Sequence, residues 1–289
     1  MSQRKQLIVI KQPENAYLAP AKLNLMLKVI GRREDGFHLL ETVFCLIDLY
    51  DTVYITPRND GKIILHNTQK DIPPQQNLVV KAAKLLQQVS GSLNKGADIE
   101  IEKIIPVGGG LGGGSSDAAT VLIVLNHLWQ CNLSRQKLQE ISVSLGADVP
   151  FFIFGKNAFA QGVGEKLSEL SIPEQEYLIV KPPVFISTAN IFQHPNLTRN
   201  DESVIINDFN DITLRNTLES VVVSEYPQVK TALNQLKKHG KAMLTGSGSC
   251  VFMPTDSRLT SQKIATEFDV SFKTFCVRSL NHHPLYHLL

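Results

Sequence analysis

The stretch from Pro106 to Ser116 reads PVGGGLGGGSS, and six of its eleven residues are glycine. Inside regular structure, glycine costs about 0.5–1 kcal/mol relative to alanine because its unfolded backbone is freer. A folded chain carries such a run where the backbone must approach another group closely or adopt positive φ. Residues 117–129 then repeat apolar side chains at helical spacing, with Ser115 or Ser116 as the predicted N-cap.

The glycine run connects a predicted strand to the start of this helix, since residues 97–105 alternate between apolar and polar side chains. Unpaired N–H groups and the positive end of the helix dipole favour an anion at such a position. The pattern therefore predicts a binding site for nucleotide phosphates. Its residues are Pro106, Val107, Gly108, Gly109, Gly110, Leu111, Gly112, Gly113, Gly114, Ser115 and Ser116.

A linker, a Walker A loop and a dinucleotide motif fit the glycine run less well. A flexible linker does not normally join a strand to a capped helix. A Walker A loop requires a lysine that is absent here. Gly108, Gly110 and Gly113 satisfy the dinucleotide pattern G-x-G-x-x-G, but a helix, a turn and another helix are predicted where that motif expects a second strand.

The length and charge of the chain exclude several classes of protein. With 289 residues it can form one large domain or two modest ones, and its formal charge of +2 argues against a nucleic-acid or anionic-membrane partner. No run approaches the ~20 apolar residues of a membrane span, and the apolar run near the N-terminus is too short for a signal peptide. Four scattered cysteines indicate reduced thiols and a cytoplasmic location. No obligate protein partner is evident.

Strands and helices are mixed without regular βαβ alternation, which predicts an α+β fold. We expect strands at 17–27, 52–56 and 97–105, and helices at 77–89, 115–129 and 134–145, the last capped by Ser134. The glycine-punctuated segment 155–165 suggests a domain boundary. Pro182-Pro183 and residues 196–210 are expected to form loops.

The sequence PVGGGLGGGSSDAA resembles the phosphate-binding motif of the GHMP kinases, which include galactokinase, homoserine kinase and mevalonate kinase. PAKLNL at 20–25 and LTGSGSC at 244–250 are similar to two further motifs of the family. Residues 31–44 and 146–165 are similar to members whose substrate carries a cytidine diphosphate group. The likeness extends from about Ala19 to the C-terminus.

The resemblance implies a two-domain fold with the active site in the interdomain cleft. Residues 1–159 would form the N-terminal ATP-binding domain and residues 160–277 the C-terminal substrate-binding domain, while the tail 278–289 would pack back on the first. ATP would be the co-substrate, Mg²⁺ would arrive with it, and the γ-phosphoryl group would pass to the 2-hydroxyl of the small-molecule substrate. No metal-ligating residue is assigned, and the histidines of the tail fit no zinc spacing.

The resemblance assigns catalysis to Asp148 as the general base and Lys22 as its electrostatic partner. Without it, Asp148 is equally typical of a loop carboxylate that caps backbone N–H groups, and Lys22 of an edge residue with its ammonium in water. Asn24 lies on the same face of the predicted strand as Lys22 and is expected to bind substrate hydroxyls.

The remaining assignments also come from the resemblance. Phe37 and His38 would hold the cytosine ring, although the family would have tyrosine where this chain has Phe37, and a phenylalanine there is also compatible with ordinary core packing. The residues expected around the substrate are Thr188, Phe192, Gly246, Ser247 and Gly248, and those expected near the adenine are Asn77 and Lys103.

Two rival functions remain compatible with parts of the sequence. Another small-molecule GHMP kinase, acting on homoserine or mevalonate, would have no use for the Gly36-Phe37-His38 segment or for Phe192. A non-catalytic nucleotide-binding protein on the same fold would have no use for Lys22 and Asp148.

Overall fold

The computed structural model describes residues 13–66, 73–206 and 208–289. The expected lack of a signal peptide concerns residues that lie outside these ranges. Within them, no helix is both long enough and apolar enough to span a bilayer. The elements are β1(Ala16–Arg32), β2(His38–Arg58), β3(Ile63–Leu65), η1(Pro74–Gln76), α1(Leu78–Ser90), β4(Gly96–Glu102), α2(Gly113–Leu128), α3(Arg135–Ser142), α4(Val149–Phe154), β5(Ala158–Gln161), β6(Lys166–Glu169), β7(Glu176–Lys181), α5(Thr188–Gln193), η2(Phe209–Asp211), β8(Arg215–Asn216), α6(Glu219–Glu225), α7(Pro227–Lys237), β9(Met243–Leu244), β10(Val251–Thr255), α8(Arg258–Ala265), β11(Lys273–Leu280) and η3(Tyr286–Leu288).

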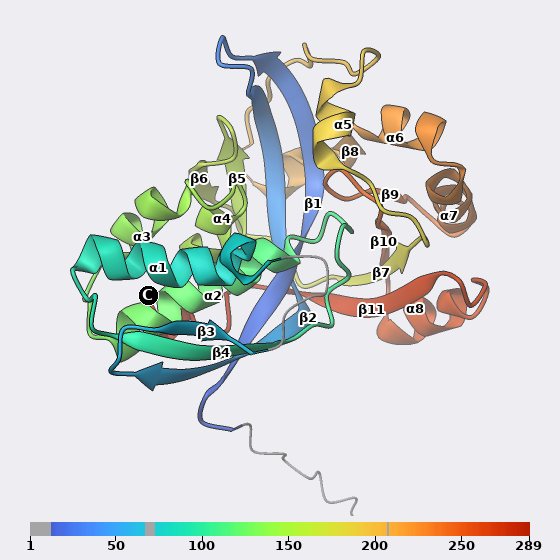
Figure 1. Ribbon diagram of the computed structural model, residues 1–289. Helices are drawn as coiled ribbons and strands as arrows, with labels where there is room; N and C mark the ends of the chain where they lie inside the picture. The colour runs from blue at the N-terminus through green and yellow to red at the C-terminus, as the bar shows by residue number, and fades with distance from the viewer. Residues whose placement is uncertain (1–12, 67–72, 207) are drawn as a thin grey trace, which may run out of the picture.

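A long antiparallel hairpin of β1 and β2 runs through the middle of the molecule (Figure 1). The described strands form one sheet whose main path is β3-β4-β2-β11-β7-β10-β9. Strand β11 pairs with β2 at its last two residues and with β7 along the rest of its length. The sheet therefore continues from the N-terminal half into the C-terminal half, and the fold is the two-domain α+β fold that the motifs predict.

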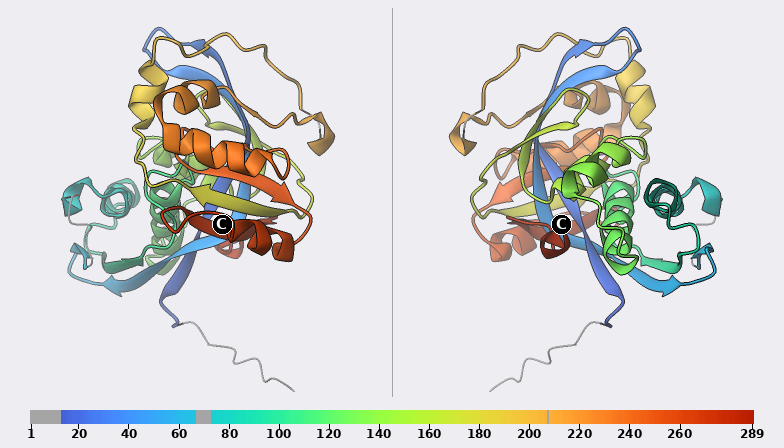
Figure 2. Two further views of the ribbon diagram at one scale, coloured as in Figure 1. Left: turned by 90° about the vertical axis from the view of Figure 1, so that its right-hand side faces the viewer. Right: turned by 90° about the vertical axis from the view of Figure 1, so that its left-hand side faces the viewer.

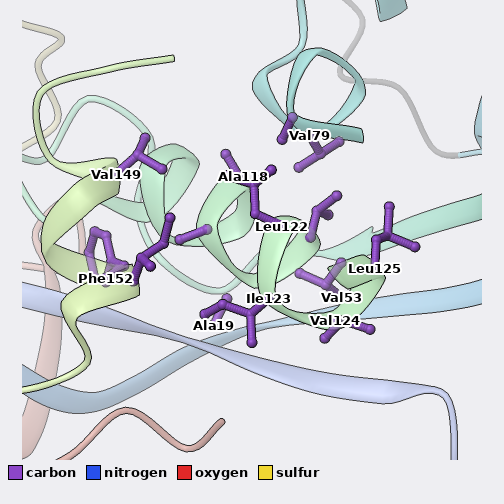
Figure 3. Packing of buried hydrophobic residues seen from close by; sticks show 14 of the residues in the cluster. Ala19, Val53, Val79, Ala118, Leu122, Ile123, Val124, Leu125, Val149 and Phe152 are labelled. Atoms are coloured by element: carbon purple, nitrogen blue, oxygen red, sulfur yellow. The ribbon is translucent and has the colours of Figure 1, made fainter. Parts of the chain in front are cut away.

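Helix α2 forms the centre of the N-terminal core. Its apolar side chains are buried all round the helix, as expected for a helix enclosed by other elements. Figure 3 shows Ala118 and Leu122 between α1 and α4, and Ile123 near Ala19 of β1. Full burial of one such leucine or isoleucine is worth about 1.5–3 kcal/mol. This packing fixes the start of α2, and with it the glycine run.

In the C-terminal half, successive side chains of β7 point to opposite faces of the sheet and so into two different cores. Leu178 and Val180 point into a core shared with α6, α7 and α8, while Tyr177 and Ile179 point into a core shared with β1 and β2. The left panel of Figure 2 views these three helices face on. One face of the C-terminal sheet is thus covered by helices, and the other packs against the central hairpin.

The predicted domain boundary, between residues 159 and 160, lies within β5, and β5 pairs with β2. The division into domains at that point stays a prediction. The end of the tail lies against the N-terminal half, because Leu285 belongs to the core around α2. Arg135 Nη1 also donates a hydrogen bond of 2.9 Å to the hydroxyl of Tyr286.

Most of the expected elements are present, and Ser134 caps α3 by accepting a hydrogen bond from Lys137 N. Several expected boundaries are wrong. The strands expected at 17–27 and 52–56 are parts of the longer β1 and β2, because these two strands pair with each other along the hairpin. The strand expected at 97–105 ends at Glu102, because Ile104 N and Ile105 N donate to Asp51 Oδ1 instead of to a neighbouring strand.

Ser115 and Ser116 do not cap α2. The helix begins earlier, at Gly113, and its N-cap is Gly112 with a φ of 75°. Only glycine adopts that conformation without a steric penalty, so the chain can enter the helix without a side-chain cap. Both serines lie within the first turn.

Candidate active site

The glycine run is folded as a tight loop between β4 and α2. Gly108, Gly110 and Gly112 all have positive φ. The loop is held from both sides: Lys22 N of β1 donates to Leu111 O, and Cys250 N donates to Gly109 O. The glycines therefore serve two purposes, the left-handed turns and the close approach of two other backbone segments.

A cavity of ≈ 330 Å³ opens over this loop and the start of α2. Residues 106–115 line it, together with Asn77 and Lys103, which were expected near the adenine. Asn77 also caps α1 by accepting a hydrogen bond from Val79 N. N–H groups at a helix start beside a cavity of this size provide a binding site for an anion such as a nucleotide phosphate.

Two carboxylates hold Lys103, and neither was predicted from the sequence as a site residue, although Asp117 lies within the PVGGGLGGGSSDAA motif. Lys103 Nζ donates to Asp51 Oδ2 and, at 2.6 Å, to Asp117 Oδ2. Burial, together with the charge of Asp51, raises the pKa of Asp117 against the opposing effect of Lys103. Burial also opposes the charge on Lys103, but the two carboxylates raise its pKa. Lys103 precedes the glycine loop and Asp117 follows it, so their contact links the two ends of the loop, and Asp51 attaches both to β2.

Lys22 and Asp148 lie side by side in a second cavity of ≈ 320 Å³, with 3.5 Å between Lys22 Nζ and Asp148 Oδ2. The Lys22 side chain is 3% exposed, which rules out an edge lysine with its ammonium in water. Burial lowers the pKa of Lys22, and the Asp148 carboxylate opposes that shift. The Asp148 side chain forms no capping hydrogen bond to α4, so the alternative interpretation of Asp148 as a capping residue is wrong.

Asn24 lies beside Lys22, as the strand spacing predicts. Lys22 Nζ donates to Asn24 Oδ1 at 2.5 Å, and Asn24 Nδ2 donates to Thr42 Oγ1 at 2.8 Å. The backbone of Asn24 also donates to Thr245 Oγ1, which attaches the segment 244–250 to β1. Gly246 and Ser247 from that segment line the same cavity as Lys22.

A third cavity, of ≈ 650 Å³, is lined by Phe37, His38, Thr188 and Phe192. The rings of His38 and Phe192 are 5.1 Å apart. Phe37 is 63% exposed, so it is not a core residue. The Thr188 and Ser247 hydroxyls are hydrogen-bonded at 2.7 Å. An exposed aromatic ring and a second ring from α5 thus flank an open cavity.

The three cavities adjoin one another. Gly110, Gly112 and Ser115 line both the first and the second, while Thr188 and Phe192 line both the second and the third. The Lys22–Asp148 pair therefore lies between the glycine loop and the aromatic cavity. Two expected site residues line none of the three: Ser116 is buried within α2, and Gly248 packs near Leu244 and Ile186.

Comparison with known proteins places this geometry in a family. Residues 77–156 match the GHMP kinases N terminal domain, and residues 197–272 match the GHMP kinases C terminal domain. A 4-diphosphocytidyl-2-C-methyl-D-erythritol kinase of Neisseria gonorrhoeae (strain NCCP11945) is 51% identical over 277 residues, covering 96% of this chain and 98% of the relative. The enzyme of that name from Azoarcus sp. (strain BH72) is 47% identical, covering 94% of this chain and 96% of the relative.

Solved structures agree. A crystal structure of 4-(cytidine 5'-diphospho)-2C-methyl-D-erythritol kinase superposes with a TM-score of 0.79 at 30% identity, covering 91% of this chain and 98% of the other. Mevalonate kinase from Methanococcus jannaschii superposes with a TM-score of 0.67 at 16% identity, covering 94% and 100% of the two chains, and so shares the fold.

Proposed function

The chain belongs to the 4-diphosphocytidyl-2-C-methyl-D-erythritol kinase family of the GHMP kinases, and we propose accordingly that it transfers the γ-phosphoryl group of ATP to the 2-hydroxyl of that substrate. The products are the 2-phosphate and ADP, and the step belongs to non-mevalonate isoprenoid biosynthesis. The observation that carries the proposal is the position of the Lys22–Asp148 pair between the glycine loop and the aromatic cavity.

In the proposed mechanism, Asp148 accepts the proton of the 2-hydroxyl as the oxygen attacks the γ-phosphorus. The bond between that phosphorus and the β,γ-bridging oxygen breaks, and ADP leaves. Phosphoryl transfer depends mainly on positioning and charge stabilisation. Lys22, buried 3.5 Å from the carboxylate, pairs with Asp148 and stabilises the developing negative charge on the substrate oxygen.

ATP occupies the first cavity in this proposal, with its phosphates on the N–H groups of residues 108–116 and its base towards Asn77. Mg²⁺ enters with ATP as part of the MgATP substrate, where it neutralises phosphate charge. We assign it no protein ligand.

The cytosine of the substrate occupies the third cavity, between Phe37 and Phe192. Stacking on an aromatic face is worth about 1–3 kcal/mol per base, so Phe37 serves without the hydroxyl of a tyrosine. The methylerythritol part then reaches the second cavity, where Asn24 binds its hydroxyls. A cytoplasmic location is part of the same proposal.

The reaction is tested by coupled measurement of ADP release with 4-diphosphocytidyl-2-C-methyl-D-erythritol, homoserine and mevalonate as alternative acceptors. We expect turnover with the first alone. Comparable turnover of homoserine or mevalonate would instead support another small-molecule kinase.

The roles of the pair are tested with Asp148→Asn, which keeps the shape of the side chain but cannot accept the proton. General-base catalysis contributes about 10²–10⁴-fold, so kcat should fall by that factor while ATP affinity is retained. Asp256→Asn is the matched control, since Asp256 is exposed and lines none of the three cavities. A folded Asp148→Asn enzyme with kcat within about threefold of the wild type would exclude the base assignment.

A further inference from the structure

Arg199 lines none of the three cavities. It forms hydrogen bonds to His38 and Phe192, which line the aromatic cavity. Its Nε donates a hydrogen bond of 3.1 Å to His38 Nε2. Its Nη2 donates to Phe192 O at 2.9 Å and to His194 O at 2.8 Å, and its Nη1 donates to Leu197 O at 3.0 Å. One guanidinium therefore joins the start of β2 to the C-terminal end of α5.

The direction of the Arg199–His38 hydrogen bond determines the protonation of the imidazole. A guanidinium has donors only, so His38 Nε2 must be the acceptor and carry no proton. A neutral histidine in this state carries its one proton on Nδ1. Burial lowers the pKa of His38, and the charges of Arg199 and Arg32 lower it further. Burial, Arg199 and Arg32 therefore all disfavour the doubly protonated form of the His38 ring.

Two carboxylates on neighbouring segments each lie beside another basic side chain. Asp35, on the turn before His38, is paired with Arg33 at 2.7 Å. Glu225 of α6 lies 3.5 Å from His194.

We propose that Arg199 is a positioning residue that fixes His38 as the neutral, Nδ1-protonated tautomer and thereby makes the aromatic cavity select cytosine over uracil. The selection follows from the edges of the two bases. N3 of cytosine is an acceptor and can receive the Nδ1–H, whereas N3 of uracil carries a hydrogen and would oppose it. Arg199 also donates to the Phe192 carbonyl, and the Phe192 ring centroid lies 5.1 Å from that of His38. The proposal rests on the proposed function, in which a cytosine occupies this cavity.

The first test is ¹⁵N NMR of the His38 side chain in the ligand-free enzyme at pH 7.5, with His38→Asn to assign the signals. We expect an unprotonated Nε2 and a protonated Nδ1 in the wild type, and a mixture of tautomers in Arg199→Met. A wild-type ring protonated at Nε2 would overturn the proposal. This measurement needs no ligand, so it is independent of the proposed function.

The second test is calorimetric titration with CDP and UDP. We expect the wild type to prefer CDP, and Arg199→Met to narrow the ratio of the two dissociation constants about tenfold, as expected for one mispaired hydrogen bond. Arg258→Met is the control, because Arg258 lies on α8 and lines none of the three cavities. An unchanged ratio in Arg199→Met would overturn the proposal. A wild type that binds neither nucleotide, yet has the expected tautomer, would count against the proposed function and not against the state of His38.

A double-mutant cycle separates the effect on His38 from a structural effect on α5. Asparagine at position 38 offers an amide N–H near the place of Nδ1–H and has no tautomers. In the His38→Asn background, Arg199→Met should therefore change the CDP/UDP ratio less than about twofold. A full tenfold change in that background would mean that Arg199 acts through α5 alone. Arg199→Gln, whose amide can both donate and accept and therefore fixes neither tautomer of His38, repeats the cycle should the methionine variant not fold.

Discussion

Two glycines of the same loop, Gly110 and Gly114, should respond to substitution in opposite ways. A Cβ added to Gly110, whose φ is 75°, would lie 2.3 Å from Thr245 O. A left-handed conformation costs an L-residue about 1–2 kcal/mol, and forcing apart well-packed segments costs a further ~1–3 kcal/mol. Gly110→Ala should therefore lose about 2–5 kcal/mol of stability.

Gly114 lies in the first turn of α2 and lines the first cavity. Apart from its chain neighbours and the nearby backbone of α2, the only described atom within 4 Å of an added Cβ is Leu78 Cδ1, at 3.9 Å. A side chain at this position would extend into the space assigned to the ATP phosphates without clashing with the protein. Gly114→Val should therefore fold normally and bind ATP poorly.

The two variants are compared by thermal unfolding and by the KM for ATP. At about 2–4 °C per kcal/mol, a loss of about 2–5 kcal/mol in Gly110→Ala should lower Tm by roughly 4–20 °C. Gly114→Val should keep Tm within about 3 °C and raise the KM for ATP about tenfold or more, because an obstructed phosphate loses several hydrogen bonds of ~1 kcal/mol each. A folded Gly114→Val enzyme with an unchanged KM for ATP would refute the placement of the phosphates. A Gly110→Ala enzyme that melts like the wild type would refute the steric argument.

Three further predictions concern the charged and aromatic groups of the site. Lys22→Met should lower kcat, and combining it with Asp148→Asn should be little worse than the poorer single variant, since both act on one hydroxyl; additive losses in kcat would contradict this. The raised pKa of Asp117 means that the folded state retains a proton that the unfolded state releases, so stability should fall as pH rises from about 4 towards neutrality. Asp117→Asn should flatten this slope in urea unfolding measured across that range, and an unchanged slope would assign it to other groups. Phe37→Tyr should leave the KM for the cytidyl substrate within about twofold, while Phe37→Ala should raise it roughly tenfold through the loss of stacking; equal KM values for the two variants would argue against stacking on this ring.

Features that depend on near neighbours in the chain could be predicted from the sequence. The apolar spacing of residues 117–129 predicted α2, and Ser134 predicted the start of α3, because helix periodicity and capping involve residues only a few positions apart. The glycine run predicted a tight loop for the same reason. The family resemblance pointed to Lys22 and Asp148, which lie 126 positions apart in the numbering, but no spacing rule gives the 3.5 Å between them.

Which distant groups meet depends on the tertiary packing. Asp51 accepts hydrogen bonds from Ile104 N and Ile105 N, which ends β4 early. Lys103, just after the strand, then donates a hydrogen bond to Asp117. The Arg199 hydrogen bond to His38 joins residues 161 positions apart. Such contacts follow from how strands pair and how helices pack against them, and each replaces a hydrogen bond to water that the unfolded chain already makes. Their net contribution is therefore small compared with the burial of the core, and the core decides where these polar groups come to lie.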